Sequence, residues 1–372
     1  MDEKKQRNKI IICVAAALVA GAVIIIIHKL YDRNRVYDSY KVEYNIDVED
    51  NADNEYYAFG TGVLKFSSDG ISYISDGKEV WNHGFEIKNP VMDICGNYIA
   101  IAEEGTNDIS IYGINGELLQ VSASYPVKSV EVSRQGVVAA VMLDDSAQYI
   151  ELIAKDGTQI AIGRTVLQGD GYPIAISLSG DATKVAASYL AVTSGEAQTR
   201  IVFYNYSEVG QNETDRIVGG FNDFNNSIVP DIEFVNDNTV AAIGDNVFAV
   251  YNIKETPSEA AKVKVKDEIK SVVYNENYIA MIIKEDDKDI LNVYNMKGKK
   301  VLSKSIDFHY TGIKIAKENI ILYNDTQCKV ISAKGVVKFD YNFGMGITSL
   351  VPLDDTTYII VSGGNVQKIT LY

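Results

Sequence analysis

Two hydrophobic patterns divide the chain. Residues 10–27 form one apolar run without a charged side chain, whereas the rest of the sequence alternates short apolar stretches with polar turns. An uncharged run of eighteen residues is long enough to cross most of a bilayer as a helix. Short stretches rich in Val, Ile and Tyr between Gly, Asn and Asp residues indicate strands. The pattern therefore predicts one transmembrane helix followed by an all-β domain.

Basic residues flank the apolar run on both sides. They are Lys4, Lys5, Arg7 and Lys9 before it, and Lys29, Arg33 and Arg35 after it. Long basic side chains at the ends of a membrane helix reach the lipid headgroups, and short basic tails generally stay in the cytoplasm. We therefore expect a single-pass protein of the cell membrane, with its N-terminus cytoplasmic and its β domain extracellular.

Three alternatives compete with this anchor. A cleavable signal peptide is disfavoured because the apolar run continues through Ile27, and a lipoprotein signal at Cys13 is disfavoured because Ile11 and Ile12 stand where small residues are expected. A buried soluble helix would lack other helices to pack against. The resulting division is a basic tail (residues 1–9), a transmembrane helix (10–27), a juxtamembrane linker (28–40) and a β domain (41–372).

The β domain repeats one unit. A β-branched strand that follows a polar turn begins near Val63, Tyr98, Val137, Val185, Thr239, Tyr278, Asn319 and Thr357. The next connection ends in a glycine in five copies, at Gly77, Gly116, Gly157, Gly298 and Gly335, as expected where a tight turn needs a positive φ. Four-stranded units of roughly 40 residues are typical of a β-propeller of the WD40-like or quinoprotein-like type.

The last unit predicts how the ring closes. It contains three clear strands, over residues 347–351, 358–361 and 366–371, and then the chain ends. The alternating segment Val42–Val48 is the best candidate for the fourth strand, and this pairing would remove an exposed sheet edge. We expect eight blades, with seven as the alternative if one weak unit is miscounted. A solenoid is a lesser alternative because neither end of the repeats resembles a cap.

Two long repeat spacings predict insertions on the fourth and fifth units, over Ala191–Thr199 and Ser207–Asn226. The second is rich in Gly, Asn and aromatic residues and is the best candidate for a contact surface, because loop side chains are not committed to the core. The candidate interaction residues are Tyr206, Gln211, Asn212, Asp215, Arg216, Phe221 and Phe224. The alternative is that Asp215 or Arg216 braces the insertion against a neighbouring blade.

Charge and composition exclude several functions. The chain has 35 basic and 50 acidic residues, and its formal net charge of −15 argues against binding of nucleic acid. Its three Cys and three His residues are too few for a disulfide framework or a zinc ribbon. Acidic clusters such as Glu285–Asp287 and Asp354–Asp355 fall at expected strand connections, where they form solvated turns. No catalytic motif or metal motif is recognisable, so we expect no enzyme activity, cofactor or metal.

The sequence resembles a family of uncharacterised membrane-anchored propeller proteins from clostridial-type Gram-positive bacteria. The stretches that carry the resemblance are Asp76–Trp81, Asp93–Ala100, Gly171–Ser179, Val209–Phe221 and Lys270–Tyr274. The resemblance implies a cytoplasmic tail, one span and an outward propeller, without any known activity. Ser75–Trp81 also resembles the Gly-x-x-x-Trp turn of quinoprotein-type propellers, but the chain has one Trp, so this turn indicates blade geometry and not a quinone cofactor.

These observations favour a binding function. We expect an extracytoplasmic scaffold that contacts a protein or a polymer of the cell envelope through loops on one face of the propeller. The alternative is a carbohydrate-active or lectin-like propeller, whose acidic residues would converge in the channel from several blades. Two carboxylates within roughly 5–10 Å of each other in one pocket would favour that alternative.

Overall fold

The computed structural model describes residues 14, 19–21, 23, 34–49, 51, 53–144, 147–165, 171–193 and 195–372. The predicted basic tail and nearly all of the predicted transmembrane helix lie outside these residues. Within the described part, no helix is long and apolar enough to cross a membrane.

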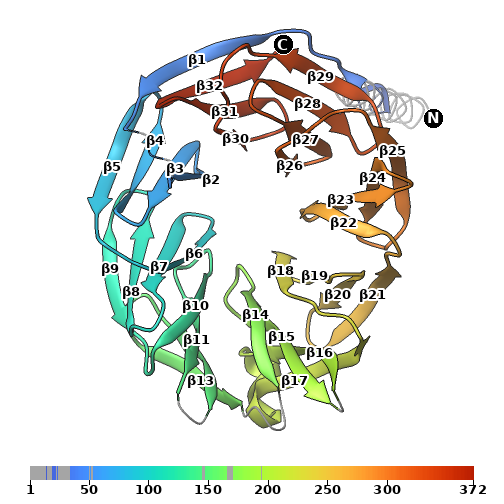
Figure 1. Cartoon of the computed structure of the whole chain (residues 1–372). Helices are drawn as coiled ribbons and strands as arrows, with labels where there is room; N and C mark the ends of the chain where they lie inside the picture. Colours follow the sequence, from blue (N-terminus) through green and yellow to red (C-terminus); the bar gives the residue numbers. More distant parts are fainter. Residues whose placement is uncertain are drawn as a thin grey trace, which may run out of the picture.

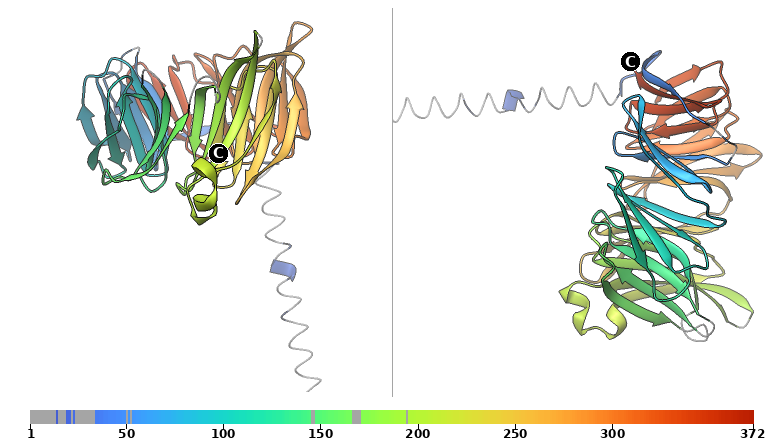
Figure 2. Two further views of the ribbon diagram at one scale, coloured as in Figure 1. Left: turned by 90° about the horizontal axis from the view of Figure 1, so that it is seen from below. Right: turned by 90° about the vertical axis from the view of Figure 1, so that its left-hand side faces the viewer.

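The described strands form eight four-stranded antiparallel sheets arranged as blades around one axis (Figure 1). Figure 2 shows the ring edge-on. Blades 1 to 4 contain β2 (Glu55–Phe59), β3 (Gly62–Ser67), β4 (Gly70–Ser75) and β5 (Lys78–Gly84); β6 (Pro90–Cys95), β7 (Tyr98–Glu103), β8 (Asp108–Gly113) and β9 (Leu118–Ser122); β10 (Val127–Val132), β11 (Val138–Leu143), β12 (Gln148–Ile153) and β13 (Gln159–Thr165); and β14 (Tyr172–Leu178), β15 (Lys184–Thr193), β16 (Glu196–Asn205) and β17 (Ile217–Asn225).

Blades 5 to 7 continue the order, and the lowest-numbered strand of each lies nearest the axis (Figure 1). They contain β18 (Asp231–Asn236), β19 (Thr239–Ile243), β20 (Val247–Ile253) and β21 (Pro257–Lys264); β22 (Glu268–Tyr274), β23 (Tyr278–Glu285), β24 (Lys288–Asn295) and β25 (Lys300–Ile306); and β26 (Gly312–Ala316), β27 (Asn319–Tyr323), β28 (Gln327–Ser332) and β29 (Val337–Asn342). This arrangement confirms the predicted all-β propeller and, together with blade 8, shows eight blades rather than seven.

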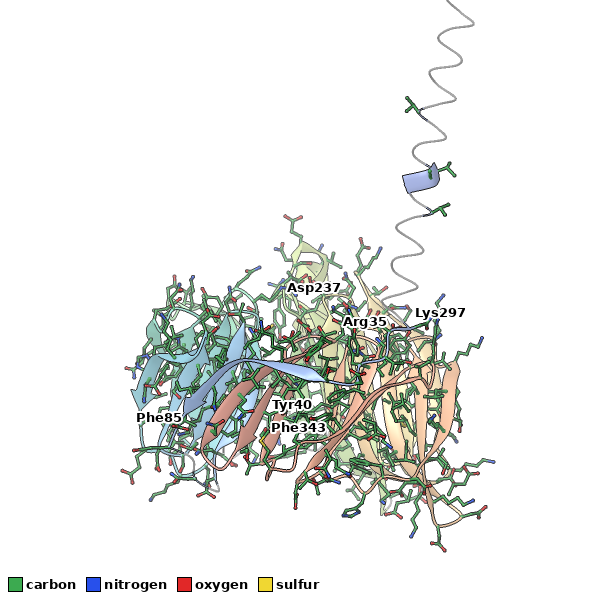
Figure 3. All side chains as sticks on the ribbon, turned by 90° about the horizontal axis from the view of Figure 1, so that it is seen from above. Arg35, Tyr40, Phe85, Asp237, Lys297 and Phe343 are labelled. Atoms are coloured by element: carbon green, nitrogen blue, oxygen red, sulfur yellow. The ribbon has the colours of Figure 1, made fainter. Side chains whose placement is uncertain are left out.

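Blade 8 closes the ring with strands from both ends of the domain. Its strands are β30 (Ser349–Pro352), β31 (Thr357–Ser362), β32 (Asn365–Leu371) and β1 (Tyr40–Asp47). The outer strand β1 pairs antiparallel with β32, from Tyr40 opposite Leu371 to Asp47 opposite Asn365. The Tyr40 ring also lies 5.0 Å from the ring of Phe343, which follows blade 7 (Figure 3). The predicted closing strand is therefore confirmed.

The repeat folds into blades because its middle strands are apolar on both faces. In β7, Ile99 and Ile101 pack in one core cluster with blade 1, whereas Ala100 and Ala102 pack in another with blade 3. Side chains that alternate along a strand point to opposite faces of the sheet. Each middle strand therefore contributes to two interfaces between blades, and the core consists of these interfaces.

The single tryptophan joins two blades. Trp81 in β5 donates a hydrogen bond from Nε1 to the carbonyl oxygen of Ile114 in blade 2, at 3.0 Å. A Cβ atom on Gly116 would lie only 2.7 Å from the Trp81 ring, and Gly116 has a φ of 84°. Position 116 therefore requires glycine for two reasons: the positive φ angle, and the lack of room for a Cβ atom beside the Trp81 ring.

Substitutions in β1 test whether closure stabilises the ring. Tyr44 and Ile46 pack against the core between blades 8 and 1. We expect the double variant Tyr44→Ala/Ile46→Ala to lower the free energy of unfolding by about 2–4 kcal/mol, because buried contacts are lost. Asn45→Ala, whose side chain is exposed in the same strand, serves as the control. Equal urea midpoints for the double variant and the control would contradict this role of β1.

Candidate functional site

The blade 4 insertion, which we define as residues 206–216, interrupts the symmetry of the ring. It contains two short 3-10 helices, η1 (Glu208–Asn212) and η2 (Thr214–Arg216), between β16 and β17. Figure 2 shows these helices projecting beyond one face of the ring. The insertion predicted over Ser207–Asn226 is therefore confirmed only as far as Arg216, because Ile217–Asn225 forms strand β17, and it belongs to blade 4 rather than to the fifth unit. The described residues of the predicted segment 191–199 belong to the extended β15–β16 hairpin of the same blade.

Local hydrogen bonds fix the start of this insertion. The side chain of Asn205 accepts hydrogen bonds from the backbone N–H and the hydroxyl of Ser207, at 2.9 and 2.6 Å. Ser207 in turn accepts one from the backbone N–H of Val209. A Cβ atom on Gly210 would lie 1.7 Å from the carbonyl oxygen of Asn205. The insertion therefore packs closely on the end of β16.

The predicted interaction residues divide into two groups. Gln211, Asn212 and Asp215 are exposed, and Tyr206 and Arg216 are partly buried. Phe221 and Phe224 belong to β17 and to the core between blades 4 and 5.

The prediction of a contact role for the two phenylalanines is corrected by their burial. Phe224 is only 2% exposed, and the Phe221 ring lies 4.5 Å from that of Tyr251. A register shift of the β16–β17 pair lies between the two residues, so that both side chains, although three positions apart, pack in the same core cluster. Tyr206, by contrast, lies in the insertion. Burial raises the pKa of its phenol, and the positive charge of the nearby Arg216 partly offsets this rise.

A band of polar residues near the axis is a feature that sequence reasoning missed. Aligning the inner strands β6, β10, β14 and β18 by their register places Asp93, Glu131, Ser177 and Glu233 at one equivalent position, opposite Ala100, Ala139, Ala186 and Ala241 of the second strands. We call these four polar residues the inner band. In blade 6 the equivalent residue, opposite Ala280, is Val273, so the pattern ends there.

Three residues of the inner band, Asp93, Glu131 and Ser177, join their blade to the next one. Asp93 accepts a hydrogen bond from the backbone N–H of Val132 in blade 3 at 2.6 Å, and Ser177 accepts one from Phe234 in blade 5 at 2.9 Å. Glu131 accepts one from the backbone of Leu178 in blade 4. Inner strands have an unpaired edge whose N–H groups need acceptors. These side chains supply them.

The carboxylates of the inner band influence one another. Burial, together with the neighbouring Asp93 and Asp231, raises the pKa of Glu233 to about 8. Burial likewise raises the pKa of Glu131, with contributions from Asp93 and Glu233. Desolvation raises the pKa of Asp93, against the backbone hydrogen bonds that stabilise its charge. Burial and mutual repulsion thus disfavour the charged form of these carboxyl groups.

An ion pair spans blade 4 at the end of the inner band. Arg134, which follows β10, contacts both carboxylate oxygens of Asp237, which follows β18, at 2.8 and 2.6 Å. The guanidinium passes over Gly180 of blade 4, where a Cβ atom would lie 2.4 Å from its Nη1 atom. Blades 3 and 5 are therefore connected across blade 4.

Neither histidines nor acidic clusters form a metal site in the described residues. No three His, Cys, Asp or Glu side chains of that part of the chain are grouped closely enough to hold a metal ion. Asp354 instead accepts backbone hydrogen bonds from Thr356 and Thr357, both at 2.8 Å. Asp286 and Asp287 have φ angles of 47° and 64°, as expected in a tight turn. Cys95 and Cys328 are free thiols.

Comparison with protein families connects this geometry to known sequences. The profile of a family of unknown function, DUF5711, matches residues 33–371, a range that contains all the strands of the ring. The chain belongs to this family. No curated protein sequence is detectably similar to it. The family match confirms the predicted relation to an uncharacterised family and leaves the activity undefined.

Several solved structures are similar to this chain at low sequence identity, and the first of them supports the propeller fold. BamB from Moraxella catarrhalis is 13% identical with a TM-score of 0.54, and the match covers 89% of this chain and 100% of BamB. Virginiamycin B lyase from Staphylococcus aureus is 11% identical with a TM-score of 0.46, covering 90% and 100% of the two chains. Hydrazine synthase from Kuenenia stuttgartiensis is 11% identical with a TM-score of 0.44, covering 88% and 95%.

The raised pKa of Glu233 predicts a stability change with pH. The folded protein holds a proton on Glu233 between its ordinary pKa of 4.5 and the folded value of about 8, whereas the unfolded chain does not. The stability from this group is therefore complete below pH 4.5 and declines as the pH rises to 8. We expect Glu233→Gln to be more stable than the wild type by roughly 1–3 kcal/mol at pH 8.5 and equally stable at pH 4.5.

Urea denaturation at both pH values measures this difference. Glu268→Gln, which changes an exposed carboxylate on the neighbouring inner strand, is the control. A Glu233→Gln variant that gains no stability at pH 8.5 would contradict the electrostatic account.

The ion pair predicts that the effects of Arg134 and Asp237 on stability are coupled, and that this coupling depends on Gly180. In a double-mutant cycle of Arg134→Met and Asp237→Asn, we expect a coupling energy of about 0.5–1 kcal/mol, since both side chains are partly exposed. In a Gly180→Ala background the new methyl group displaces the guanidinium, and the coupling should disappear. Gly346→Ala is the control, because no atom lies within 4 Å of its added Cβ. Unchanged coupling in Gly180→Ala would contradict the arrangement.

Proposed function

We propose that this protein is a single-pass membrane protein whose extracytoplasmic propeller is a scaffold for a protein partner or an envelope polymer. The observation that carries the proposal is the blade 4 insertion. It breaks the symmetry of the ring, is fixed by hydrogen bonds to β16 and presents Gln211, Asn212 and Asp215 to solvent. A surface that is both exposed and rigid binds a partner with little loss of conformational entropy.

The path of the chain supports a contact near the membrane. Arg35 lies on the same face of the ring as Asp237 (Figure 3), and the insertion projects from that face (Figure 2). The eight residues from His28 to Arg35 span at most about 28 Å. With residues 10–27 in the bilayer, the insertion would face the membrane, and the partner would lie between the ring and the lipid surface.

The inner band supports a scaffold more than a carbohydrate-active channel. Asp93 and Glu131 are engaged with the backbone of the next blade, and Asp231 accepts a hydrogen bond from the Tyr274 hydroxyl at 2.7 Å. Carboxylates committed to such bonds hold blades together. We therefore propose a binding function without a catalytic step, and no nucleic-acid partner, because the net charge is −15.

Cross-linking in membranes tests the proposed surface. We expect full-length wild type to give a reproducible cross-linked partner in the membrane fraction, and Gln211→Ala/Asn212→Ala to lose most of it because the contacting side chains are removed. The control is Glu276→Ala/Asn277→Ala, which changes an exposed turn of blade 6. Deletion of residues 10–27 should release the chain from the membrane fraction. An identical partner pattern in both pairs of variants would contradict the proposed surface.

A further inference from the structure

We infer that a pocket beside the insertion binds a carboxylate group of the partner; this inference rests on the proposed scaffold function and names its ligand chemistry. The pocket has a volume of about 50 Å³ and lies between β13 of blade 3 and the β16–β17 side of blade 4. Its walls include Arg164, Thr165, Arg200, Tyr204, Tyr206 and Asp215. The insertion therefore supplies part of the pocket, and the neighbouring blade supplies the opposite wall.

Arginine is concentrated at this pocket. The described residues contain five arginines, of which Arg164 and Arg200 line the pocket and Arg216 stands between two of its lining residues, Asp215 and Ile217. In a chain with net charge −15, this grouping is a local reversal of charge. A guanidinium group has a planar fork of donors that matches a carboxylate. The pocket is thus built to receive an anion.

Arg216 is held in place at a conformational cost. Asp215 and Arg216 have φ angles of 54° and 63°, a region that side-chain-bearing residues rarely adopt. The Nη1 atom of Arg216 is buried and has no hydrogen-bond partner among the described residues. The guanidinium is close enough to Tyr206 to lower the pKa of its phenol against the effect of burial. Arg216 does not itself line the pocket, but an anion bound beside its neighbours Asp215 and Ile217 that reached this donor would give it a charge-assisted hydrogen bond.

Size and charge favour a carboxylate over a phosphate. The volume of about 50 Å³ accommodates a group of a few atoms. Asp215 in the wall repels a dianion more strongly than a monoanion, and the acidic surface of the whole domain disfavours a polyanion. A carboxylate carries one charge and two acceptor oxygens. An acidic side chain or a free C-terminus of the partner therefore fits best.

Ligand-observed saturation-transfer NMR on the full-length protein tests this pocket. The probe is N-acetyl-Ala-Ala with a free carboxylate, and the comparison ligand is the same dipeptide as its amide. We expect transfer to the acid and not to the amide, competition by acetate and not by inorganic phosphate, and at least tenfold weaker binding to Arg164→Met and Arg216→Met. Lys297→Met, at an exposed turn, should bind like the wild type. Circular dichroism establishes that each variant is folded.

Several outcomes would overturn the inference. They are equal transfer to the acid and the amide, binding that both arginine variants leave unchanged, and stronger competition by phosphate than by acetate. Loss of partner cross-linking with normal probe binding would instead contradict the proposed scaffold surface alone. Normal cross-linking without probe binding would contradict the carboxylate pocket alone, so the two proposals fail separately.

Discussion

The pairing of β1 with β32 is the interaction on which the rest of the structure depends. It supplies the fourth strand of blade 8 and covers an edge that would otherwise be open to other chains. The segment before β1 is attached to blade 7, because the backbone N–H of Tyr37 donates to the carbonyl oxygen of Lys338 at 2.7 Å. The closing strand is also the first strand after the predicted anchor. A force on that anchor would therefore act directly on the closure of the ring.

Two kinds of contact hold the blades together. Apolar interfaces recur around the whole ring, whereas the inner band and the ion pair of Arg134 with Asp237 strengthen blades 2 to 5. Blade 4 lies within this region and carries the insertion. The inner band and this ion pair thus fix blade 4 to both of its neighbours, which gives the proposed contact surface a rigid support.

The sequence predicted the fold more completely than the surfaces. Alternating apolar residues and turn glycines are local signals, so the blades, the closing strand and the insertion could be found from them. Contacts between blades join distant residues: Asp93 meets Val132, and Arg134 meets Asp237. Aligning the inner strands of the repeats would have placed the inner band in one column, but no local signal places Arg164 beside Arg200. The contact role predicted for Phe224 is wrong because strand β17 begins directly after the insertion and carries this side chain into the core.

Hydrogen exchange measured by mass spectrometry tests the central claim about closure most directly. If β1 and β32 close the ring, the β1 amides that bond to β32 will exchange as slowly as those of β31 in the same blade, because they open only when the blade opens. Exchange of the β1 segment within seconds, while β31 remains protected, would contradict the account. The ring would then be an open array with a loosely attached N-terminal segment.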